Sequence, residues 1–167
     1  LGTVEPNFPG AGAPGQTLDV TYDIEGSDIG YRWYAREGLE PLFPLGHGLS
    51  YTSFAHDELE VEREGDRLIA RFTVRNVGER AGADVPQVYL ADAAGRAMRR
   101  LAGFAKVELA PGEARTLELP LEWRVVAEWQ EDGWEIAPGR YRFVLAKDAL
   151  ADGPSDTIEL PRRTFAK

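Results

Sequence analysis

The chain has 167 residues, 43% of them hydrophobic and 28% charged, which is typical of a soluble globular domain. Its net charge of −9 disfavours nucleic acid as a partner, and no apolar run reaches the roughly 18 residues of a membrane-spanning helix. With no cysteine and only two histidines, the sequence excludes disulfides and thiolate sites and predicts no metal or other cofactor.

Residues 1–56 are predicted to form an irregular extension. Three prolines and three glycines lie between Pro6 and Gln16, and both residue types interrupt helices and sheet ladders. A short β-prone run follows at residues 17–24. The chain begins at Leu1 and not at Met, without the basic and apolar regions of a signal peptide. We therefore expect this sequence to be part of a longer protein.

Aromatic residues are dense in the second half of the extension. In residues 30–34, GYRWY, alternation predicts an extended segment with Tyr31 and Trp33 on one face and Arg32 and Tyr34 on the other. Arg32, Trp33 and Tyr34 are candidate sugar contacts, because aromatic faces pack on sugar rings and Arg can bridge hydroxyls. We favour packing between domains, since clustered apolar residues usually mark an interface. The residues expected to pack in this way are Tyr31, Trp33, Phe43, Tyr51 and Phe54.

Residues 57–167 are predicted to form a β-sandwich. Apolar Leu59 and Val61 alternate with glutamates, which indicates a half-buried strand, and a turn at residues 64–66 pairs this strand with the next in a hairpin. About seven short strands separated by turn signals are typical of an immunoglobulin-like antiparallel sandwich. The predicted strands lie near residues 58–62, 67–75, 84–92, 101–107, 117–123, 140–147 and 158–160.

Five positions within this region carry more specific predictions. Pro86 indicates an edge strand or a bulge, because proline donates no hydrogen bond to a ladder. Tyr141, after a Pro-Gly turn, resembles a tyrosine corner whose hydroxyl binds nearby backbone. Trp123 is in phase with the apolar residues of its strand and is expected in the core. Trp129 and Trp134 are candidate sugar contacts, and with Trp123 they would make a binding platform if the three were exposed and coplanar.

One histidine and a set of five arginines are interpreted as structural and not as functional residues. His47 lies between two glycines, and we expect a loop residue that hydrogen-bonds backbone, since no neighbouring group would orient it as a base. Arg67, Arg71 and Arg75 recur on one outward strand face among acidic residues, which favours a solvated face over an anion site; Arg99 and Arg100 are given the same interpretation.

Four stretches together resemble the C-terminal part of glycoside hydrolase family 3, the β-glucosidase and β-xylosidase family. Residues 30–54, with GYRWY and LEPLFPLGHGLSYTSF, resemble the segment that joins its second domain, an α/β sandwich, to its third. Residues 72–90, 101–121 and 134–145 resemble strands of its fibronectin type III-like domain. Ala35 stands where the family often has Asp, and Leu45 where it often has Phe.

The resemblance implies that catalysis resides elsewhere. In the family, the nucleophile and the acid/base carboxylate lie in upstream domains, so no residue here inherits either role, and residues 1–56 would be the tail and linker of the preceding domain. The expected function is an inactive accessory domain that packs against upstream catalytic domains of an enzyme cleaving terminal β-linked sugars by a retaining mechanism. Alternatives are a module that binds polysaccharide or oligosaccharide and an interaction domain docking on a separate catalytic chain. A periplasmic or secreted location is common in the family.

Overall fold

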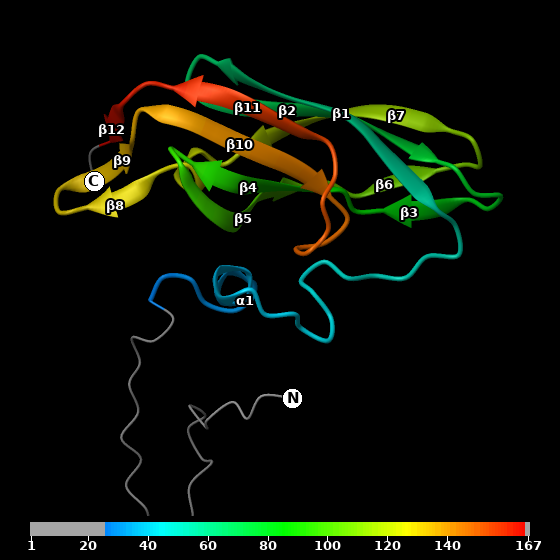
Figure 1. Cartoon of the computed structure of the whole chain (residues 1–167). Helices are drawn as coiled ribbons and strands as arrows, with labels where there is room; N and C mark the ends of the chain where they lie inside the picture. Colours follow the sequence, from blue (N-terminus) through cyan, green and yellow to red (C-terminus); the bar gives the residue numbers. More distant parts are fainter. Residues whose placement is uncertain (1–25, 166–167) are drawn as a thin grey trace, which may run out of the picture.

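The computed structural model describes residues 26–165, and its architecture confirms the predicted antiparallel β-sandwich (Figure 1). The described residues contain twelve strands and two short helices, α1 (Tyr31–Glu37) and the 3₁₀ helix η1 (Trp123–Val125). The strands are β1 (Phe54–Glu64), β2 (Arg67–Asn76), β3 (Gly82–Asp84), β4 (Gln87–Ala93), β5 (Arg96–Phe104), β6 (Val107–Leu109), β7 (Ala114–Leu121), β8 (Glu128–Gln130), β9 (Gly133–Ile136), β10 (Gly139–Ala146), β11 (Ser155–Leu160) and β12 (Arg163–Phe165).

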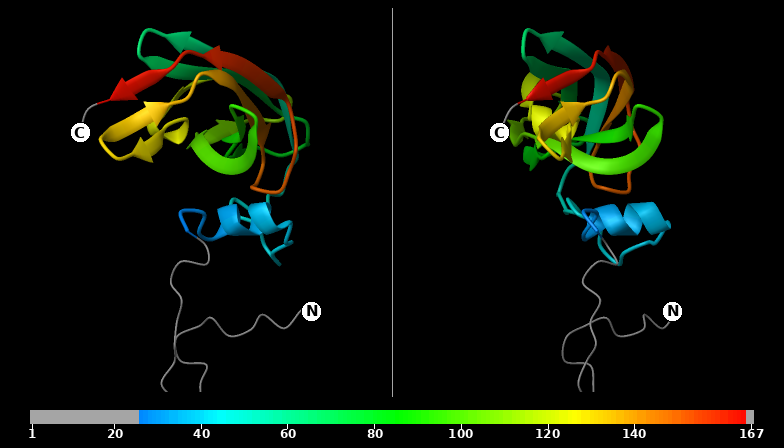
Figure 2. Two further views of the ribbon diagram at one scale, coloured as in Figure 1. Left: turned by 60° about the vertical axis from the view of Figure 1, so that its left-hand side comes forward. Right: turned by 90° about the vertical axis from the view of Figure 1, so that its left-hand side faces the viewer.

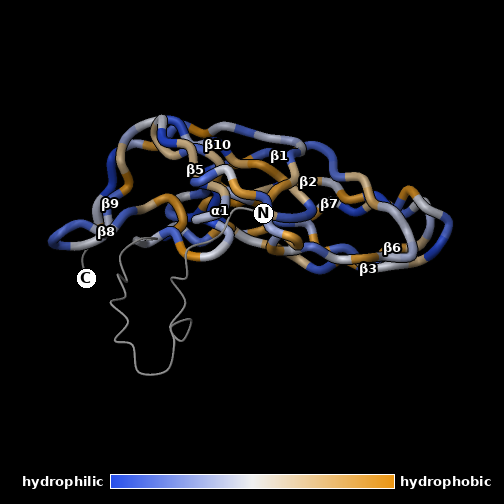
Figure 3. The backbone as a smooth tube through the Cα atoms, turned by 60° about the horizontal axis from the view of Figure 1, so that its bottom comes forward, coloured by the Kyte–Doolittle hydropathy of each residue, from blue (hydrophilic) through white to orange (hydrophobic). Residues whose placement is uncertain are grey.

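Two sheets form the layers of the sandwich. One has the order β1-β2-β7, and the other has the order β11-β10-β4-β5. The first two strands form the predicted hairpin, with an antiparallel ladder from Phe54 opposite Asn76 to Glu64 opposite Arg67. Hydrophobic and hydrophilic residues are interspersed along the strands, whereas the loops at the two ends of the sandwich are largely hydrophilic (Figure 3).

Pro86 separates two strands that would otherwise be continuous. β3 pairs with β6 up to Asp84 opposite Val107, and β4 pairs with β5 from Gln87 opposite Phe104. The ladder is interrupted between them because proline has no N–H to donate. β4 is also an inner strand between β10 and β5, so Pro86 does not mark an edge strand. Interruptions of this kind partly explain why the described residues contain twelve strands where about seven were predicted.

The main core lies between the two sheets. Phe72 and Val74 of β2 face Leu90 of β4 and Phe143 of β10, and all four are at most 1% exposed. These residues follow the period of two by which a strand presents alternate side chains to one face. Tyr141 confirms the predicted tyrosine corner, since its hydroxyl donates to the carbonyl oxygen of Ala137 at 2.7 Å.

A second cluster covers the outer face of the four-stranded sheet. Tyr89, Val144, Ala146 and Ala149 are buried there, and Tyr31 of α1 packs against them. β4 and β10 are therefore buried on both faces, which explains their continuous apolar runs, VYLA and FVLA. Two rotated views show α1 beneath the sandwich, against one face of it (Figure 2).

The extended segment predicted at residues 30–34 is wrong: the chain is helical from Tyr31 to Glu37. Gly38, with φ 64°, ends the helix in the left-handed conformation that glycine adopts without strain. In a helix, residues three apart lie on the same face, so Tyr31 and Tyr34 are not on opposite faces as they would be in a strand. Neither helix of the described residues has the length and apolarity to cross a membrane.

The predicted strand around Trp123 ends earlier than expected. β7 stops at Leu121, and Trp123 begins η1. The side chain is partly buried and packs against the main core, where its ring stacks on Phe165 of β12 with centroids 3.9 Å apart. β12 pairs with β9 and β9 with β8, a small sheet at one end of the sandwich. Trp123 therefore contributes to the core, as predicted, from a helix and not from a strand.

Candidate functional site

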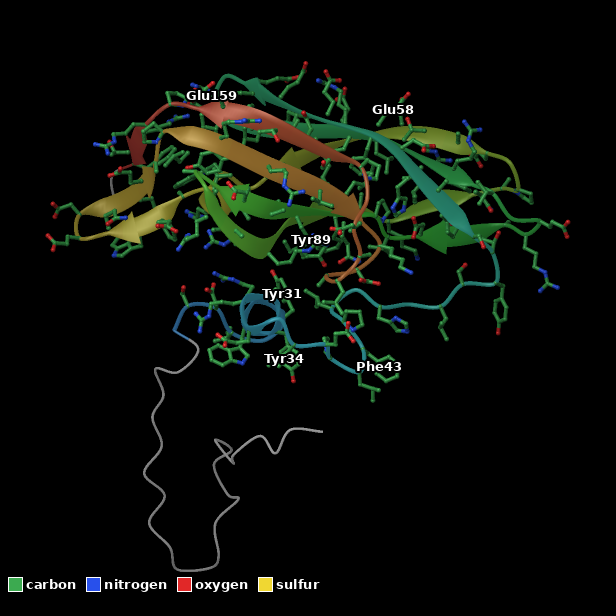
Figure 4. The ribbon with its side chains drawn as sticks, in the orientation of Figure 1. Tyr31, Tyr34, Phe43, Glu58, Tyr89 and Glu159 are labelled. Atoms are coloured by element: carbon green, nitrogen blue, oxygen red, sulfur yellow. The ribbon has the colours of Figure 1, made fainter. Side chains whose placement is uncertain are left out.

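The extension, which in the structure means residues 26–53, is held on the sandwich by three sets of contacts. The first is made by Tyr31, whose hydroxyl accepts a hydrogen bond from the backbone N–H of Leu101 at 2.9 Å. Its ring meets Tyr89 edge to face, with centroids 6.2 Å apart (Figure 4). Burial, with the nearby Tyr31, raises the pKa of Tyr89 far above its usual range. Tyr31 therefore anchors the helix on the outer face of the four-stranded sheet.

The second anchor is built around Gln87, a buried polar side chain of β4. Its amide Nε2 donates to the carbonyl oxygen of Lys147 at 2.7 Å, and its Oε1 accepts from the Tyr89 hydroxyl at 2.5 Å. Gly46 of the extension lies directly on this amide, and a Cβ placed there would be 2.2 Å from Nε2 of Gln87. The adjacent Leu45 carbonyl accepts from the N–H of Ala149 at 2.9 Å.

The third anchor is Asn76, which is fully buried at the end of β2. Its Oδ1 accepts from the Thr52 hydroxyl at 2.7 Å, and its Nδ2 donates to the carbonyl oxygens of Arg80 and Leu109. The N–H of Val77 donates to the Ser53 carbonyl at 2.9 Å. Side-chain and backbone bonds together fix the path by which the extension enters β1.

The face of the extension turned away from the sandwich is apolar and exposed. Leu49 is 94% exposed, Tyr51 91%, Leu42 89% and Phe43 67%. Phe43 lies below the sandwich, and its ring is tilted on that of His47 at 5.2 Å (Figure 4). We call this set the apolar strip; it consists of Ile29, Leu39, Leu42, Phe43, Leu45, Leu49 and Tyr51. A series of exposed large apolar side chains on one anchored segment is typical of a surface that meets a partner.

The five residues predicted to pack between domains fall into three environments. Tyr31 contacts the second cluster, and Phe54 packs against the main core at the start of β1. Trp33 is half-buried beneath the guanidinium of Arg36, 4.6 Å from the ring centroid. Phe43 and Tyr51 belong to the exposed apolar strip. Their role in packing against another domain stays a prediction.

A hollow of about 1170 Å³ lies between α1 and the end of the sandwich formed by β5, η1, β8 and β9. Four of the five candidate sugar contacts line it, although they come from segments almost 100 residues apart: Arg32, Tyr34, Trp129 and Trp134. The fifth, Trp33, is not among its lining residues. We call this the arginine hollow, because six arginines line it: Arg32, Arg36, Arg96, Arg99, Arg100 and Arg124.

Acidic residues neutralise only some of these arginines. Arg32 pairs with Asp28 at 2.7 Å, Arg36 pairs with Asp28 and Glu37, and Arg96 pairs with Glu128. Arg100 instead donates to the carbonyl oxygen of Val125 at 2.8 Å. Burial, together with the positive charges of Arg32 and Arg96, lowers the pKa of Arg100. The hollow therefore carries excess positive charge in a chain whose net charge is −9.

The tryptophans do not form the coplanar platform considered from the sequence. Trp129 and Trp134 meet edge to face, at 80° and 5.5 Å, while Trp123 is turned 87° from Trp134 and stacked on Phe165. Trp129 is 50% exposed and Trp134 is partly buried. The two rings that line the hollow form an angled corner and not a flat surface.

Other charged groups have structural partners. Arg71 contacts Glu62, Glu64 and Glu118, which raises the pKa of Arg71 and agrees with the predicted solvated face. The same interpretation is wrong for Arg99 and Arg100, which are partly buried and donate to the backbone carbonyl oxygens of Ala151 and Val125. Nε2 of His56 lies 2.6 Å from Oδ2 of Asp84. Within residues 26–165, no three histidine, aspartate or glutamate side chains gather as a metal site would require. His47, as predicted, is a loop residue.

Sequence reasoning missed the arginine hollow, because its charge depends on distant segments brought together by the fold. It also missed the two-sided burial of the four-stranded sheet, although the apolar runs at 88–91 and 143–146 carried that signal. A strand covered on one face alternates, whereas one covered on both faces does not. Recognising those runs would have predicted that some segment covers the outer face.

Comparison with known proteins finds that the chain is similar to one part of several β-glucosidases. Residues 84–149 match the model of the fibronectin type III-like domain. Thermostable β-glucosidase B of Acetivibrio thermocellus is 37% identical over 145 residues, which are 81% of this chain and 19% of that protein.

Solved structures agree with this match. β-Glucosidase 3B from Thermotoga neapolitana, in complex with α-D-glucose, superposes on 86% of this chain with a TM-score of 0.79 and 30% identity. A glycoside hydrolase family 3 β-glucosidase from Bifidobacterium adolescentis superposes on 83% with a TM-score of 0.75 and 30% identity. The chain covers 21% of each of these two structures, so it spans about a fifth of the length of the proteins it matches.

Proposed function

The chain belongs to the fibronectin type III-like domains of family 3 β-glucosidases, and from this we propose that it stabilises the catalytic domains of such an enzyme without taking part in the chemistry. The observation that carries the proposal is the apolar strip. Its residues are exposed although the segment that bears them is anchored at Tyr31, Gly46 and Thr52. An apolar surface on an anchored segment loses less entropy on association than an unattached segment would, and it gains from the burial of its side chains.

The domain boundary follows from the same proposal. Residues 1–56 are the tail and linker of the preceding α/β sandwich domain, and residues 57–167 are the fibronectin type III-like domain. The start of β1 at Phe54 supports a boundary close to this position. The complete enzyme hydrolyses terminal β-linked sugars by a retaining mechanism, with both carboxylates in the upstream domains.

Substitution of the strip in the complete enzyme tests the proposed role. Leu42→Ser together with Tyr51→Ser should lower the melting temperature of the catalytic domains and shorten the half-life of activity, since each buried apolar side chain contributes about 1.5–3 kcal/mol. Phe104→Ser is the control, because Phe104 is 62% exposed on β5 of the sandwich and lies outside the strip. In the isolated 167-residue chain the double substitution should reduce binding of a hydrophobic dye and leave the unfolding midpoint unchanged.

Two results would contradict the proposal. One is a complete enzyme whose melting temperature and activity are unaffected by the double substitution. The other is glycosidase turnover by the isolated chain that disappears when one of its own acidic residues is replaced. A strip that serves a separate catalytic chain would give the same dye result, and that chain would co-purify with this one.

Carbohydrate binding is a second candidate function, favoured by one observation. Arg32, Tyr34, Trp129 and Trp134, chosen from the sequence as sugar contacts, line a single hollow. Aromatic rings and forked hydrogen-bond donors are the side chains that bind sugar faces and hydroxyls. Titration with oligosaccharides should then change the fluorescence of Trp129, and Trp129→Ala should abolish that change.

A further inference from the structure

The arginine hollow concentrates positive charge on a strongly acidic chain. Within the part of the chain that the structure describes, Arg100 and Arg124 form no ion pair. The guanidinium of Arg124 lies 5.2 Å from the ring centroid of Trp123, and that of Arg100 donates to a backbone carbonyl. The chain has 28 acidic residues, yet none of those that the structure describes pairs with either of these two arginines in the hollow.

The surroundings of Arg100 favour an anion. Arg100 is partly buried. Its burial lowers its pKa, and the nearby positive charges of Arg32 and Arg96 lower it further. Asp28 and Glu128 already pair with Arg32 and Arg96. An anion entering the hollow would relieve the remaining repulsion among the arginines, and guanidinium groups bind carboxylates through two parallel hydrogen bonds.

The aromatic corner beside these charges distinguishes among anions. Trp129 is half-exposed and meets Trp134 at 80°, and both rings line the hollow. The C–H faces of a sugar ring pack on such surfaces, whereas a glutamate or aspartate side chain offers only one or two methylene groups. The volume of about 1170 Å³ exceeds the roughly 300–1,000 Å³ typical of small-molecule sites and leaves room for more than one ring.

We propose that the arginine hollow binds a saccharide that carries carboxylate groups. Arg100 and Arg124 pair with the carboxylates, and Trp129 packs against a ring. The inference rests on the second candidate function, carbohydrate binding, and names the class of sugar. Of the apolar strip, Leu39 also lines the hollow, but the residues substituted to test the strip do not.

Three probes test the proposal on the 167-residue chain by calorimetry and tryptophan fluorescence. They are an oligogalacturonate, a neutral cello-oligosaccharide of the same length, and a glutamate peptide of the same charge. Only the oligogalacturonate should bind, and its affinity should fall as salt is raised because the interaction is partly between charges.

Matched substitutions locate the site. Arg124→Gln and the double variant with Arg100→Gln should weaken oligogalacturonate binding by about tenfold or more, since each removes a charge-assisted hydrogen bond. Arg75→Gln is the control, because it removes the same charge from an exposed position on β2, outside the residues that line the hollow. Arg124 is exposed, so that Arg124→Gln keeps the test valid if the double variant fails to fold.

Each remaining outcome overturns the proposal in a different way. Equal binding of the neutral sugar would leave carbohydrate binding intact and remove the selectivity for carboxylates. Equal binding of the glutamate peptide would make the hollow an acidic-peptide site. Failure of all three probes to bind, or equal loss with Arg75→Gln, would remove both this inference and the second candidate function, while the role of the apolar strip would be unaffected.

Discussion

The sandwich and the extension use aromatic residues in opposite ways. In the sandwich, Phe72 and Phe143 are at most 1% exposed, and they pack within a core formed by residues of the two sheets and of η1. In the extension, Phe43 is 67% exposed and Tyr51 is 91% exposed, although anchors on both sides hold the segment in place. The sandwich is therefore organised around its own core, whereas the extension packs on the sandwich with one side and exposes apolar side chains on the other.

The energetic consequence is that the two regions should respond differently to the same substitution. Stability of the sandwich depends on the area buried in the core, which is shared by strands far apart in the sequence. Attachment of the extension depends on a few local contacts, so that it can open without global unfolding. Paired substitutions, one in each region, therefore test whether the two regions differ in this way.

The largest expected effect comes from a matched pair of phenylalanines. Phe143→Ala should lower the free energy of unfolding by about 3–5 kcal/mol, because it leaves a cavity in the middle of β10. Phe43→Ala should change it by less than about 0.5 kcal/mol, since the ring is already exposed. Urea unfolding followed by circular dichroism measures both. Similar losses for the two variants would contradict the distinction between the regions.

A glycine pair tests the attachment of the extension. Gly46→Ala should destabilise the docked extension by about 1–3 kcal/mol, because φ is +86° and the new Cβ would collide with the Gln87 amide. Hydrogen exchange at the N–H of Ala149, which donates to Leu45, should accelerate while exchange in the core stays slow. Gly48→Ala is the control, since a Cβ there meets nothing within 4 Å. Equal acceleration in both variants would show that Gly46 is no special contact.

Removing one tyrosine hydroxyl in each region compares the contribution of a single hydrogen bond to stability in the sandwich and in the extension. Tyr141→Phe should lower global stability by about 1 kcal/mol, because the carbonyl of Ala137 loses its donor. Tyr31→Phe leaves the N–H of Leu101 without its acceptor, and the expected result is faster local exchange at Leu101 with a smaller change in the unfolding midpoint. A reversed order of the two midpoints would place the main stabilising contact in the extension.

Much of the sandwich could be predicted because its signals are local. Alternation at Leu59 and Val61 predicted β1, and the Pro-Gly turn before Tyr141 predicted the tyrosine corner. The helix at Tyr31–Glu37 was missed, because seven residues carry too short a pattern to separate a helical from an extended period. Gly38, at the position of a helix C-cap, was the signal that sequence reasoning left unused.

The candidate site was less predictable, for a physical reason. The exposure of Tyr51 and the burial of Tyr31 depend on which side of the extension meets the sandwich, and the sequence of the extension alone does not specify that side. Trp129 and Arg32 were each proposed as sugar contacts, but their common location follows only from the docking of α1 against β5, which brings both residues to one hollow. Contacts between distant segments are set by tertiary packing and carry no short-range pattern.

The smallest expected effect concerns backbone strain within the sandwich. Ala94, with φ 52°, and Gly95, with φ 90°, form the two-residue loop between β4 and β5, and such loops favour asparagine followed by glycine. Ala94→Asn should therefore raise the free energy of unfolding by about 0.5–1 kcal/mol, and Ala94→Val should lower it, because β-branched residues resist the left-handed conformation. Thermal melts of the two variants measure the difference. Shifts of the same sign would mean that strain at Ala94 does not limit the stability of the sandwich, whereas opposite signs would show that the region with the complete core still retains a locally unfavourable position.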